Sequence, residues 1–450
     1  MKRIIDHFLL QWKHDPLRKA LLLRGARQVG KTYSIRKLAT TYPDFVEINF
    51  ELRLDAHAIF EKDLEPDRIL RELSLIARKP IIPGKTLLFL DEIQIVPNAI
   101  TALRYFYEMR PELHVIAAGS LLDFAIEEIG IPVGRVQSLY MHPVSFIEYL
   151  ASSGEGLIVD EIMNHSIDQE MGKSVHDRIL GLLGEYLAVG GMPHAIQEWI
   201  QKKNALSCSR IHHSLLDTYR QDFSKYARKL QIKYVELLFD QVPLQLGQKF
   251  KYSSIDGEYR KRELAPALDL LVTAGIAHKI FYTAGQGVPL GAQIDEQDYR
   301  VLFLDIGLAQ SALSLDLAGW FLSPSQEFIN KGALVEAFVG QEMLVYDQPH
   351  SKNTLFYWHK ESCSQQAEID YLIQIQGEII PVEVKAGLGR TIKSLRYFLE
   401  KHPKSTYGIR FSAQNYSLHE HVFSYPLYAI AHVFSEKNEE IKQAIQKLLV

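Results

Sequence analysis

Short apolar runs separated by mixed polar segments dominate the first third of the chain. Four runs have the length of buried parallel strands, about 4 to 8 residues, and they span residues 20–23, 45–50, 87–90 and 114–118. The segment 33–40, which follows the first run, places its apolar residues on one helical face. Strands that alternate with helices predict a parallel sheet covered by helices on both faces.

The pattern changes after about residue 150. Residues 151–241 read as helical and polar, which favours a helical lid or linker. Residues 242–322 contain two helical patterns followed by a pair of strands, the order found in a winged helix. This segment is also the most basic of the chain, with Lys249, Lys251, Arg260, Lys261 and Arg262. These side chains either contact phosphates or form a solvated helix face.

Strands return in the last quarter of the chain. Residues 368–373 and 379–385 lie on either side of the turn Gln376-Gly377, which predicts a β-hairpin. The final segment, 436–450, has apolar residues at helical spacing and predicts a docked C-terminal helix. Its apolar positions are Ile441, Ala444, Ile445, Leu448 and Leu449.

The composition is that of an ordinary globular protein, with 47% hydrophobic and 23% charged residues among 450. The formal net charge of −4 gives no overall attraction to nucleic acid, so such binding needs a local patch. The two cysteines, Cys208 and Cys363, lie far apart, which excludes a cysteine-based zinc cluster and fits a reducing compartment. No apolar stretch approaches the ~18 residues that span a bilayer. The N-terminus has no secretion signal, so we expect a cytoplasmic protein without a membrane partner.

The strongest motif is G-x-x-x-x-G-K-T between a predicted strand and a predicted helix. In this context, backbone N–H groups wrap the phosphates of a nucleoside triphosphate at the start of the helix. Lys31 is expected at the β- and γ-phosphates, and the Thr32 hydroxyl at Mg²⁺. Arg24 and Arg27 either add positive charge near the phosphates or are solvated. The residues expected to bind ATP are Gly25, Ala26, Arg27, Gln28, Val29, Gly30, Lys31 and Thr32.

Two acidic residues at the end of the strand 87–90 indicate hydrolysis of the triphosphate. Asp91 is expected to hold Mg²⁺, and Glu92 to polarise the attacking water. A water-activating glutamate has no use in a small-molecule kinase, so that class is disfavoured. Ser120 follows the strand 114–118. It is expected to contact the γ-phosphate or the attacking water, to cap the next helix, or to do both.

A family resemblance extends these motifs. The strings LLLRGARQVGKT, LLFLDEIQ, VIAAGSLL and VGRVQSLYMHPVSFIEYL, in this order, resemble the bacterial and archaeal AAA-type ATPases that carry a C-terminal DUF4143 region. The resemblance implies that Arg135, after Gly134, contacts the γ-phosphate in its own or a neighbouring subunit. A surface arginine without such a task is the alternative. Turn elements at 190–193 and 305–308 match the family as well.

The predicted C-terminal hairpin carries a second chemical pattern. Asp370, Glu383 and Lys385 have the spacing of the PD-(D/E)xK nuclease fold. Strand alternation places Glu383 and Lys385 on one face, where Asp370 and Glu383 are expected to share a divalent metal. Lys385 would then orient or activate a water molecule. Glu336, on a preceding helix, matches the acid that this fold takes from its first helix. A charged strand pair at a solvent face is the alternative.

These observations predict an α/β protein with a P-loop NTPase core, a helical lid, a winged-helix-like region and a PD-(D/E)xK nuclease-like domain. The expected boundaries are 1–150 for the ATPase core, 151–241 for the lid or linker, 242–322 for the winged-helix-like region, 323–435 for the nuclease-like domain and 436–450 for the C-terminal helix.

The leading hypothesis is an ATP-hydrolysing AAA-type protein whose C-terminal domain acts on or binds DNA. Its cofactors would be ATP and Mg²⁺, with a second Mg²⁺ or Mn²⁺ at Glu336, Asp370 and Glu383. Nuclease-like folds also persist as binding modules, so cleavage stays open. The alternative hypothesis is a non-cutting, ATP-dependent switch that binds a protein partner. The oligomeric state is open, and a homo-oligomer is compatible with the sequence.

Overall fold

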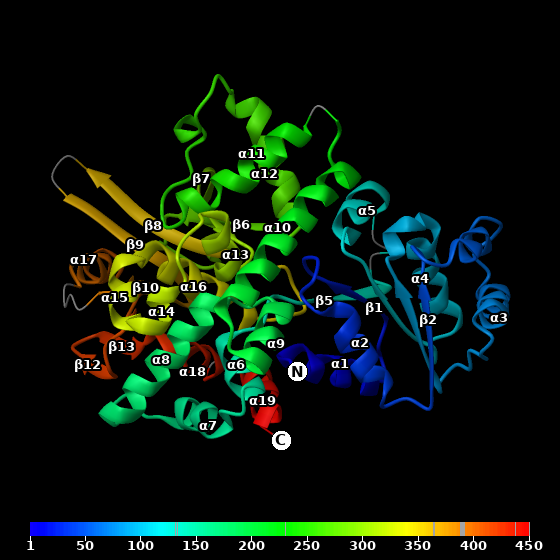
Figure 1. The fold of residues 1–450 in the computed structure, drawn as a ribbon, viewed down its shortest axis with the longest axis horizontal. Helices are drawn as coiled ribbons and strands as arrows, with labels where there is room; N and C mark the ends of the chain where they lie inside the picture. The colour runs from blue at the N-terminus through cyan, green and yellow to red at the C-terminus, as the bar shows by residue number, and fades with distance from the viewer. Residues whose placement is uncertain are drawn as a thin grey trace. The chain divides into compact units, whose positions relative to one another are not determined.

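The structure is a computed structural model that describes residues 1–449 except for 131, 133, 230, 363, 364, 388–391 and 437. The chain divides into two compact units (Figure 1). The first unit contains residues 1–142 and 348–352, and the second contains residues 143–347 and 353–450.

The first unit is built on a five-stranded parallel sheet with the order β2-β3-β4-β1-β5. Its strands are β1 (Ala20–Arg24), β2 (Asp44–Asn49), β3 (Thr86–Asp91), β4 (His114–Ala118) and β5 (Val136–Tyr140). The first four confirm the strands expected from the apolar runs. The sequence analysis missed β5, which contains two consecutive polar residues, Gln137 and Ser138, and is mostly half-buried.

Helices cover the first sheet, whose central strands are largely apolar. Every residue of β3 and of β4 is buried, as expected for strands with helices on both faces. Leu88 and Leu90 of β3 pack in one core with Ile69 of α3 and Leu103 of α4. The helices of this unit are α1 (Ile4–His14), α2 (Lys31–Ala39), α3 (Pro66–Ala77), α4 (Pro97–Met109) and α5 (Leu122–Ile129).

The second unit begins with a helical region. Its helices before the second sheet are α6 (Phe146–Ser152), α7 (Gly156–Asn164), α8 (Lys173–Val189), α9 (Pro193–Lys202), α10 (Ala205–Tyr226), α11 (Ile232–Gln241) and α12 (Lys261–Thr273). Later helices are α13 (Ile306–Ala312), α14 (Ala318–Leu322), α15 (Pro324–Asn330), α16 (Gly332–Val345), α17 (Lys393–Lys401), α18 (Ile430–Ser435) and α19 (Glu439–Leu449). The last is the expected C-terminal helix, which buries Ile441, Ala444, Ile445 and Leu448.

A mixed eight-stranded sheet organises the rest of this unit, in the order β12-β13-β11-β10-β9-β8-β6-β7. Its strands are β6 (Ala277–Thr283), β7 (Ile294–Phe303), β8 (Leu355–Ser362), β9 (Gln365–Ile375), β10 (Glu378–Lys385), β11 (Gly408–Ser412), β12 (Ser417–His419) and β13 (Val422–Pro426). β6 pairs antiparallel with β7 and parallel with β8. The strand pair of the predicted winged-helix region therefore belongs to the same sheet as the predicted nuclease-like hairpin β9–β10.

Candidate nucleotide site and C-terminal acidic cluster

The loop between β1 and α2 has the backbone shape that its glycines permit. Gly25 and Gly30 have φ angles of 142° and 103°, values that favour glycine. A side chain on Gly25 would place its Cβ 2.2 Å from the backbone oxygen of Met141. Gln28, between the two glycines, also has a positive φ, of 66°. The loop thus passes close to the chain after β5 before it enters α2.

Lys31 is buried at the start of α2, with 8% of its surface exposed. Its Nζ donates hydrogen bonds to the carbonyl oxygens of Gly25 at 2.6 Å and Ala26 at 2.8 Å. Burial lowers the pKa of Lys31 to about 8, against the opposing charges of Glu92 and Asp91. The ammonium group is therefore held inside the loop by carbonyl oxygens and faces two carboxylates.

Oxygen atoms suited to a hard cation converge at the end of β3. Thr32 Oγ1 lies 3.4 Å from Asp91 Oδ2, which also accepts a hydrogen bond from Asn49 Nδ2 at 3.2 Å. Burial, and then the neighbouring charge of Glu92, raises the pKa of Asp91. A bound cation would relieve this. Hydroxyl and carboxylate oxygens are ligands that Mg²⁺ prefers, so these residues fit the ion that accompanies ATP.

Glu92 and Ser120 are joined across the ends of β3 and β4. Glu92 Oε2 accepts hydrogen bonds from Ser120 Oγ at 3.2 Å and from Gln94 Nε2 at 2.6 Å. Helix α5 begins at Leu122, and its N-cap residue is Leu121, without a side-chain capping bond. The capping alternative for Ser120 is therefore wrong, because the serine hydroxyl is used by Glu92.

The three arginines considered near the phosphates have different surroundings. Arg24 forms an ion pair with Asp123 and stacks over the ring of Tyr140, which makes it a structural residue. Arg27 is half-buried in the loop. Arg135 pairs through its Nε with Glu108 Oε1 at 2.6 Å, and its side chain is 43% exposed.

Sequence reasoning missed Arg3, which lies just before α1 and supports the phosphate loop. This buried side chain donates hydrogen bonds to the backbone oxygens of Val29 at 2.9 Å and His142 at 2.7 Å. It therefore fixes one wall of the loop to the end of the unit. An arginine before the first helix carries no motif, so only the fold reveals its position.

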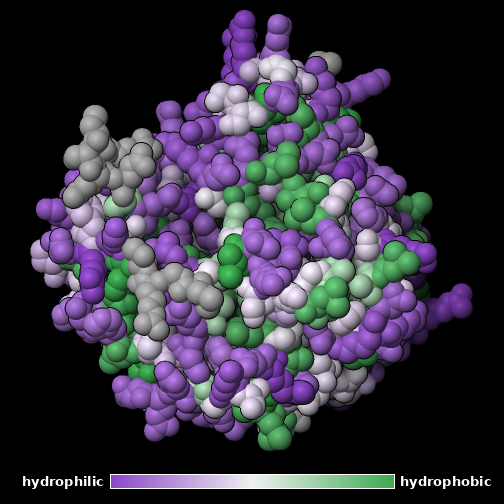
Figure 2. Space-filling view, turned by 60° about the vertical axis from the view of Figure 1, so that its left-hand side comes forward, coloured by the Kyte–Doolittle hydropathy of each residue, from purple (hydrophilic) through white to green (hydrophobic). Residues whose placement is uncertain are grey.

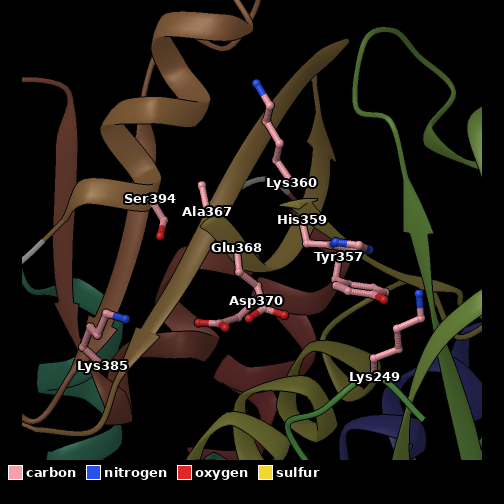
Figure 3. Close-up of a pocket in the computed structure, with 9 residues that line it drawn as sticks. All are labelled: Lys249, Tyr357, His359, Lys360, Ala367, Glu368, Asp370, Lys385 and Ser394. Atoms are coloured by element: carbon pink, nitrogen blue, oxygen red, sulfur yellow. The ribbon is translucent and has the colours of Figure 1, made fainter. Parts of the chain in front are cut away.

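The acids of the predicted nuclease-like site do come together in the second unit. Glu336 lies on α16, Asp370 on β9, and Glu383 with Lys385 on β10. Lys385 Nζ pairs with Glu383 Oε1 at 2.8 Å. Asp370 Oδ2 accepts a hydrogen bond from the backbone N–H of Val384 at 2.7 Å. The carboxylates of Glu368 and Asp370 lie side by side in Figure 3.

A residue that the sequence analysis did not consider, Arg300 on β7, lies within this cluster. It is 1% exposed, and its Nη1 lies 2.6 Å from Glu336 Oε1 and 3.8 Å from Asp370 Oδ1. Its Nη2 pairs with Glu368. Burial raises the pKa of Glu336 to about 7, with a further contribution from Asp370.

The predicted second metal site at Glu336, Asp370 and Glu383 is not supported. Within the part of the chain that the structure describes, no group of three His, Cys, Asp or Glu side chains is arranged to hold a metal ion. The physical reason is that Arg300 and Lys385 already form ion pairs with two of these carboxylates, Glu336 and Glu383. A divalent ion would have to approach a fixed guanidinium charge.

Family models match three parts of the chain. One described as an AAA domain matches residues 17–150, and a domain of unknown function, DUF4143, matches residues 331–430. The chain therefore carries an AAA domain and a C-terminal DUF4143 region. A second domain of unknown function, DUF8612, matches residues 180–318 of this AAA-type protein. No curated protein matches the chain.

Solved structures show more distant likeness to the AAA-type protein. A Walker-type ATPase of Pyrococcus abyssi is 14% identical over 69% of this chain and 95% of its own, with a TM-score of 0.43. The Hsp104–ADP complex of S. cerevisiae is 14% identical over 76% of this chain and 43% of its own, with a TM-score of 0.26. We draw no functional argument from likeness at these TM-scores.

Two further features of this AAA-type protein concern the polarity of its surface and the length of its apolar helices. In Figure 2 the visible face is largely hydrophilic, and hydrophobic residues form patches separated by polar ones. Among the described residues, the search for a helix long and apolar enough to cross a membrane finds none.

Proposed function

We propose that the first unit binds ATP with Mg²⁺ and hydrolyses it, and that the second unit acts on or binds DNA. The observation that carries the first part is the convergence of Lys31, Thr32, Asp91, Glu92 and Ser120. They lie at the carboxyl ends of β1, β3 and β4, the edge at which parallel α/β sheets bind ligands.

Each residue has a role in this proposal. In this proposal the phosphates take the place of the carbonyl oxygens of Gly25 and Ala26 as partners of the buried Lys31 ammonium. Thr32 and Asp91 hold Mg²⁺, which supplies charge stabilisation at the phosphates. Glu92 orients the attacking water, and Ser120 and Gln94 fix the direction of its carboxylate.

Arg135 is proposed as a contact to the γ-phosphate in the same subunit or a neighbouring one. Its side chain is partly exposed and its partner is a single surface glutamate, Glu108. Exposed ion pairs contribute only about 0.2–1 kcal/mol, so this pair opens at little cost. A role supplied by a neighbouring subunit would require a homo-oligomer.

The direct test of the ATPase proposal is Lys31→Ala. We expect loss of ATP turnover in a phosphate-release assay, because the γ-phosphate loses its buried cation, with the circular dichroism spectrum unchanged. Lys62→Ala, a substitution of an exposed lysine in the same unit, is the control and should retain turnover. Normal hydrolysis by Lys31→Ala would overturn the proposal.

For the second unit, the placement of Arg300 favours binding of DNA over its cleavage. The acids of the predicted catalytic set are paired with cations of the protein rather than left for a metal. We therefore expect no Mg²⁺- or Mn²⁺-dependent cutting of DNA, with or without ATP. A non-cutting switch that binds a protein partner remains the second candidate, and it predicts binding to a partner with little dependence on salt.

A further inference from the structure

Two cavities in the second unit share Lys249 as a common wall. The first has a volume of about 390 Å³, lies over the acidic cluster, and is also lined by Lys360 and Lys385. The second has a volume of about 420 Å³ and is lined by Gln245 and Lys251 as well. We refer to the two cavities together as the Lys249 groove. Each is large enough for a segment of a polar ligand.

Lysines outnumber acids along the Lys249 groove. Four lysines and three acids line it: Lys249, Lys251, Lys360 and Lys385, with Asp256, Glu368 and Asp370. Figure 3 shows Lys249 and Lys385 on opposite sides of the two central carboxylates, and Lys360 pointing away from them. Lys251 is exposed and, among the described residues, forms no ion pair. Its ammonium group is therefore available to an anionic ligand.

A buried donor without a partner points to a ligand in the second cavity. Gln245 is 8% exposed, and its Oε1 accepts the backbone N–H of Lys251 at 2.8 Å. Its Nε2 has no hydrogen-bond partner among the described residues. A buried donor without an acceptor costs free energy in the folded state. A ligand that brings an acceptor oxygen to this amide would remove that cost.

The segment that carries Gln245 and Lys251 also forms part of the wall of the acidic cluster. A side chain on Gly247 would place its Cβ 3.2 Å from Glu336 Oε2. The backbone of Lys249 forms an antiparallel β-bridge with Arg300, and its Nζ forms an ion pair with Asp298 at 2.5 Å. The two cavities therefore lie beside the same short stretch of packed chain, and Lys249 lines both of them.

Arg300 supplies the positive charge that a divalent ion would bring to the acids. An arginine keeps its charge at all physiological pH values. Arg300 is buried against Glu336 and Asp370, and its Cζ lies 4.6 Å from the centre of the Tyr357 ring. Part of the negative charge of these carboxylates is thus compensated by a group that cannot dissociate from the protein. An anionic strand can then approach without a metal.

We propose that the Lys249 groove binds the phosphodiester backbone of a DNA strand without a divalent metal and without cutting it. Lys249 and Lys251 contact phosphates, and Gln245 donates a hydrogen bond to the strand. The inference rests on the proposed action on DNA, and it goes further because it names the surface and removes the metal from the binding step.

The test is fluorescence anisotropy with the full chain, a chelator, no ATP and a labelled DNA strand of about 20 nucleotides, longer than one typical single-strand site. We expect binding in the chelator that weakens steeply with salt. Lys251→Gln should weaken it about 5-fold and lower the slope of log K against log salt by about 0.7. Gln245→Leu should weaken binding and leave the slope unchanged, because it removes a neutral donor.

Lys173→Gln is the control, because this exposed lysine begins α8, outside the groove. Thermal unfolding of each variant excludes misfolding, and Lys251, being exposed, is safe to replace in this respect. If the wild-type protein binds DNA and both variants, Lys251→Gln and Gln245→Leu, bind it with the wild-type affinity, DNA does not bind in the Lys249 groove. The proposed DNA role then still stands. If binding or strand cutting appears only with Mg²⁺ or Mn²⁺, the metal-free claim is wrong. If wild-type protein binds no DNA, the proposed DNA role itself fails.

Discussion

At the residue scale, the two sites differ in how each holds its buried cation. Lys31 is bonded to the carbonyl oxygens of Gly25 and Ala26, neutral groups that a phosphate can replace. Arg300 is bonded to carboxylates, and removing either partner would leave a buried charge without compensation. Lys31 therefore suits a ligand that arrives and leaves, whereas Arg300 suits a permanent element of the structure.

Gly25→Ala tests whether the loop requires its glycine. A Cβ at this position would meet the backbone of Met141, and backbone atoms cannot move aside cheaply. We expect at least a tenfold loss of ATP affinity, equivalent to about 1.4 kcal/mol, in isothermal titration calorimetry. Gly84→Ala is a matched control, because Gly84 also has a positive φ but has no atoms near its added Cβ. Equal ATP affinity in both variants would contradict the proposed loop geometry.

The nucleotide-site residues could be proposed from the sequence because they lie in local motifs. Strand, loop and helix follow one another between residues 20 and 40, so adjacency in the chain gives adjacency in space. Arg3 and Arg300 could not be found in this way. Arg300 lies on β7, distant in sequence from Glu336 and Asp370, and it reads as an ordinary charge within a strand until the sheet order is known.

At the element scale, the two turns that match the family, 190–193 and 305–308, pack against each other. We call this contact the joint. Asp305 caps α13 by accepting the backbone N–H of Leu308 at 2.9 Å, and its other oxygen accepts the N–H of Gly191 at 2.5 Å. Gly190 and Gly307 pack so closely that a Cβ on either would collide with the other turn. The joint fixes the end of α8 to the start of α13, which gives both turns a structural role.

The joint makes stability depend on pH. Burial raises the pKa of Asp305 from 3.8 to about 6. The folded protein therefore keeps a proton that the unfolded chain has released between these pH values. We expect the free energy of unfolding to fall as pH rises through this window, by on the order of 3 kcal/mol. Urea unfolding followed by tryptophan fluorescence suits this unit, which contains Trp199, Trp320 and Trp358.

Asp305→Asn should flatten this pH profile, since the amide does not titrate, and should lower stability at low pH because one acceptor is lost. Asp177→Asn replaces an exposed acid of α8 in the same unit and should keep the wild-type profile. An unchanged slope in Asp305→Asn would show that the buried carboxyl does not control the joint.

Long-range pairing limited the prediction of elements more than local pattern did. The pair of strands expected in residues 242–322 is found as β6 and β7, but the pairing of β6 with β8 could not be foreseen. A local pattern fixes which residues form a strand and which face they bury. It does not fix the partner strand, which depends on contacts across 70 residues or so. The boundaries at 322 and 323 stay predictions for this reason.

At the scale of the whole molecule, the chain passes from the second unit to the first and back again. Residues 348–352 belong to the first unit although α16 before them and β8 after them belong to the second. The backbone N–H of Tyr140, on β5, donates to the oxygen of Pro349 at 2.8 Å. The nucleotide unit is therefore covalently continuous with α16, which carries Glu336, and with β8, which carries Tyr357.

We propose that this continuity couples the ATP state of the first unit to the acidic cluster. Coupling between the two would be reciprocal, so that DNA would change ATP affinity by the same factor as ATP changes DNA affinity. Everything at this scale depends on whether the first unit hydrolyses ATP with the residues assigned to it.

The most direct measurement of that claim is a single-turnover assay of Glu92→Gln. The account predicts that this variant binds ATP with wild-type affinity and hydrolyses it at least 100-fold more slowly, within the range that a positioned acid–base group contributes. Glu128→Gln, an exposed substitution on α5, should hydrolyse ATP at the wild-type rate. Unchanged hydrolysis by Glu92→Gln would contradict the account.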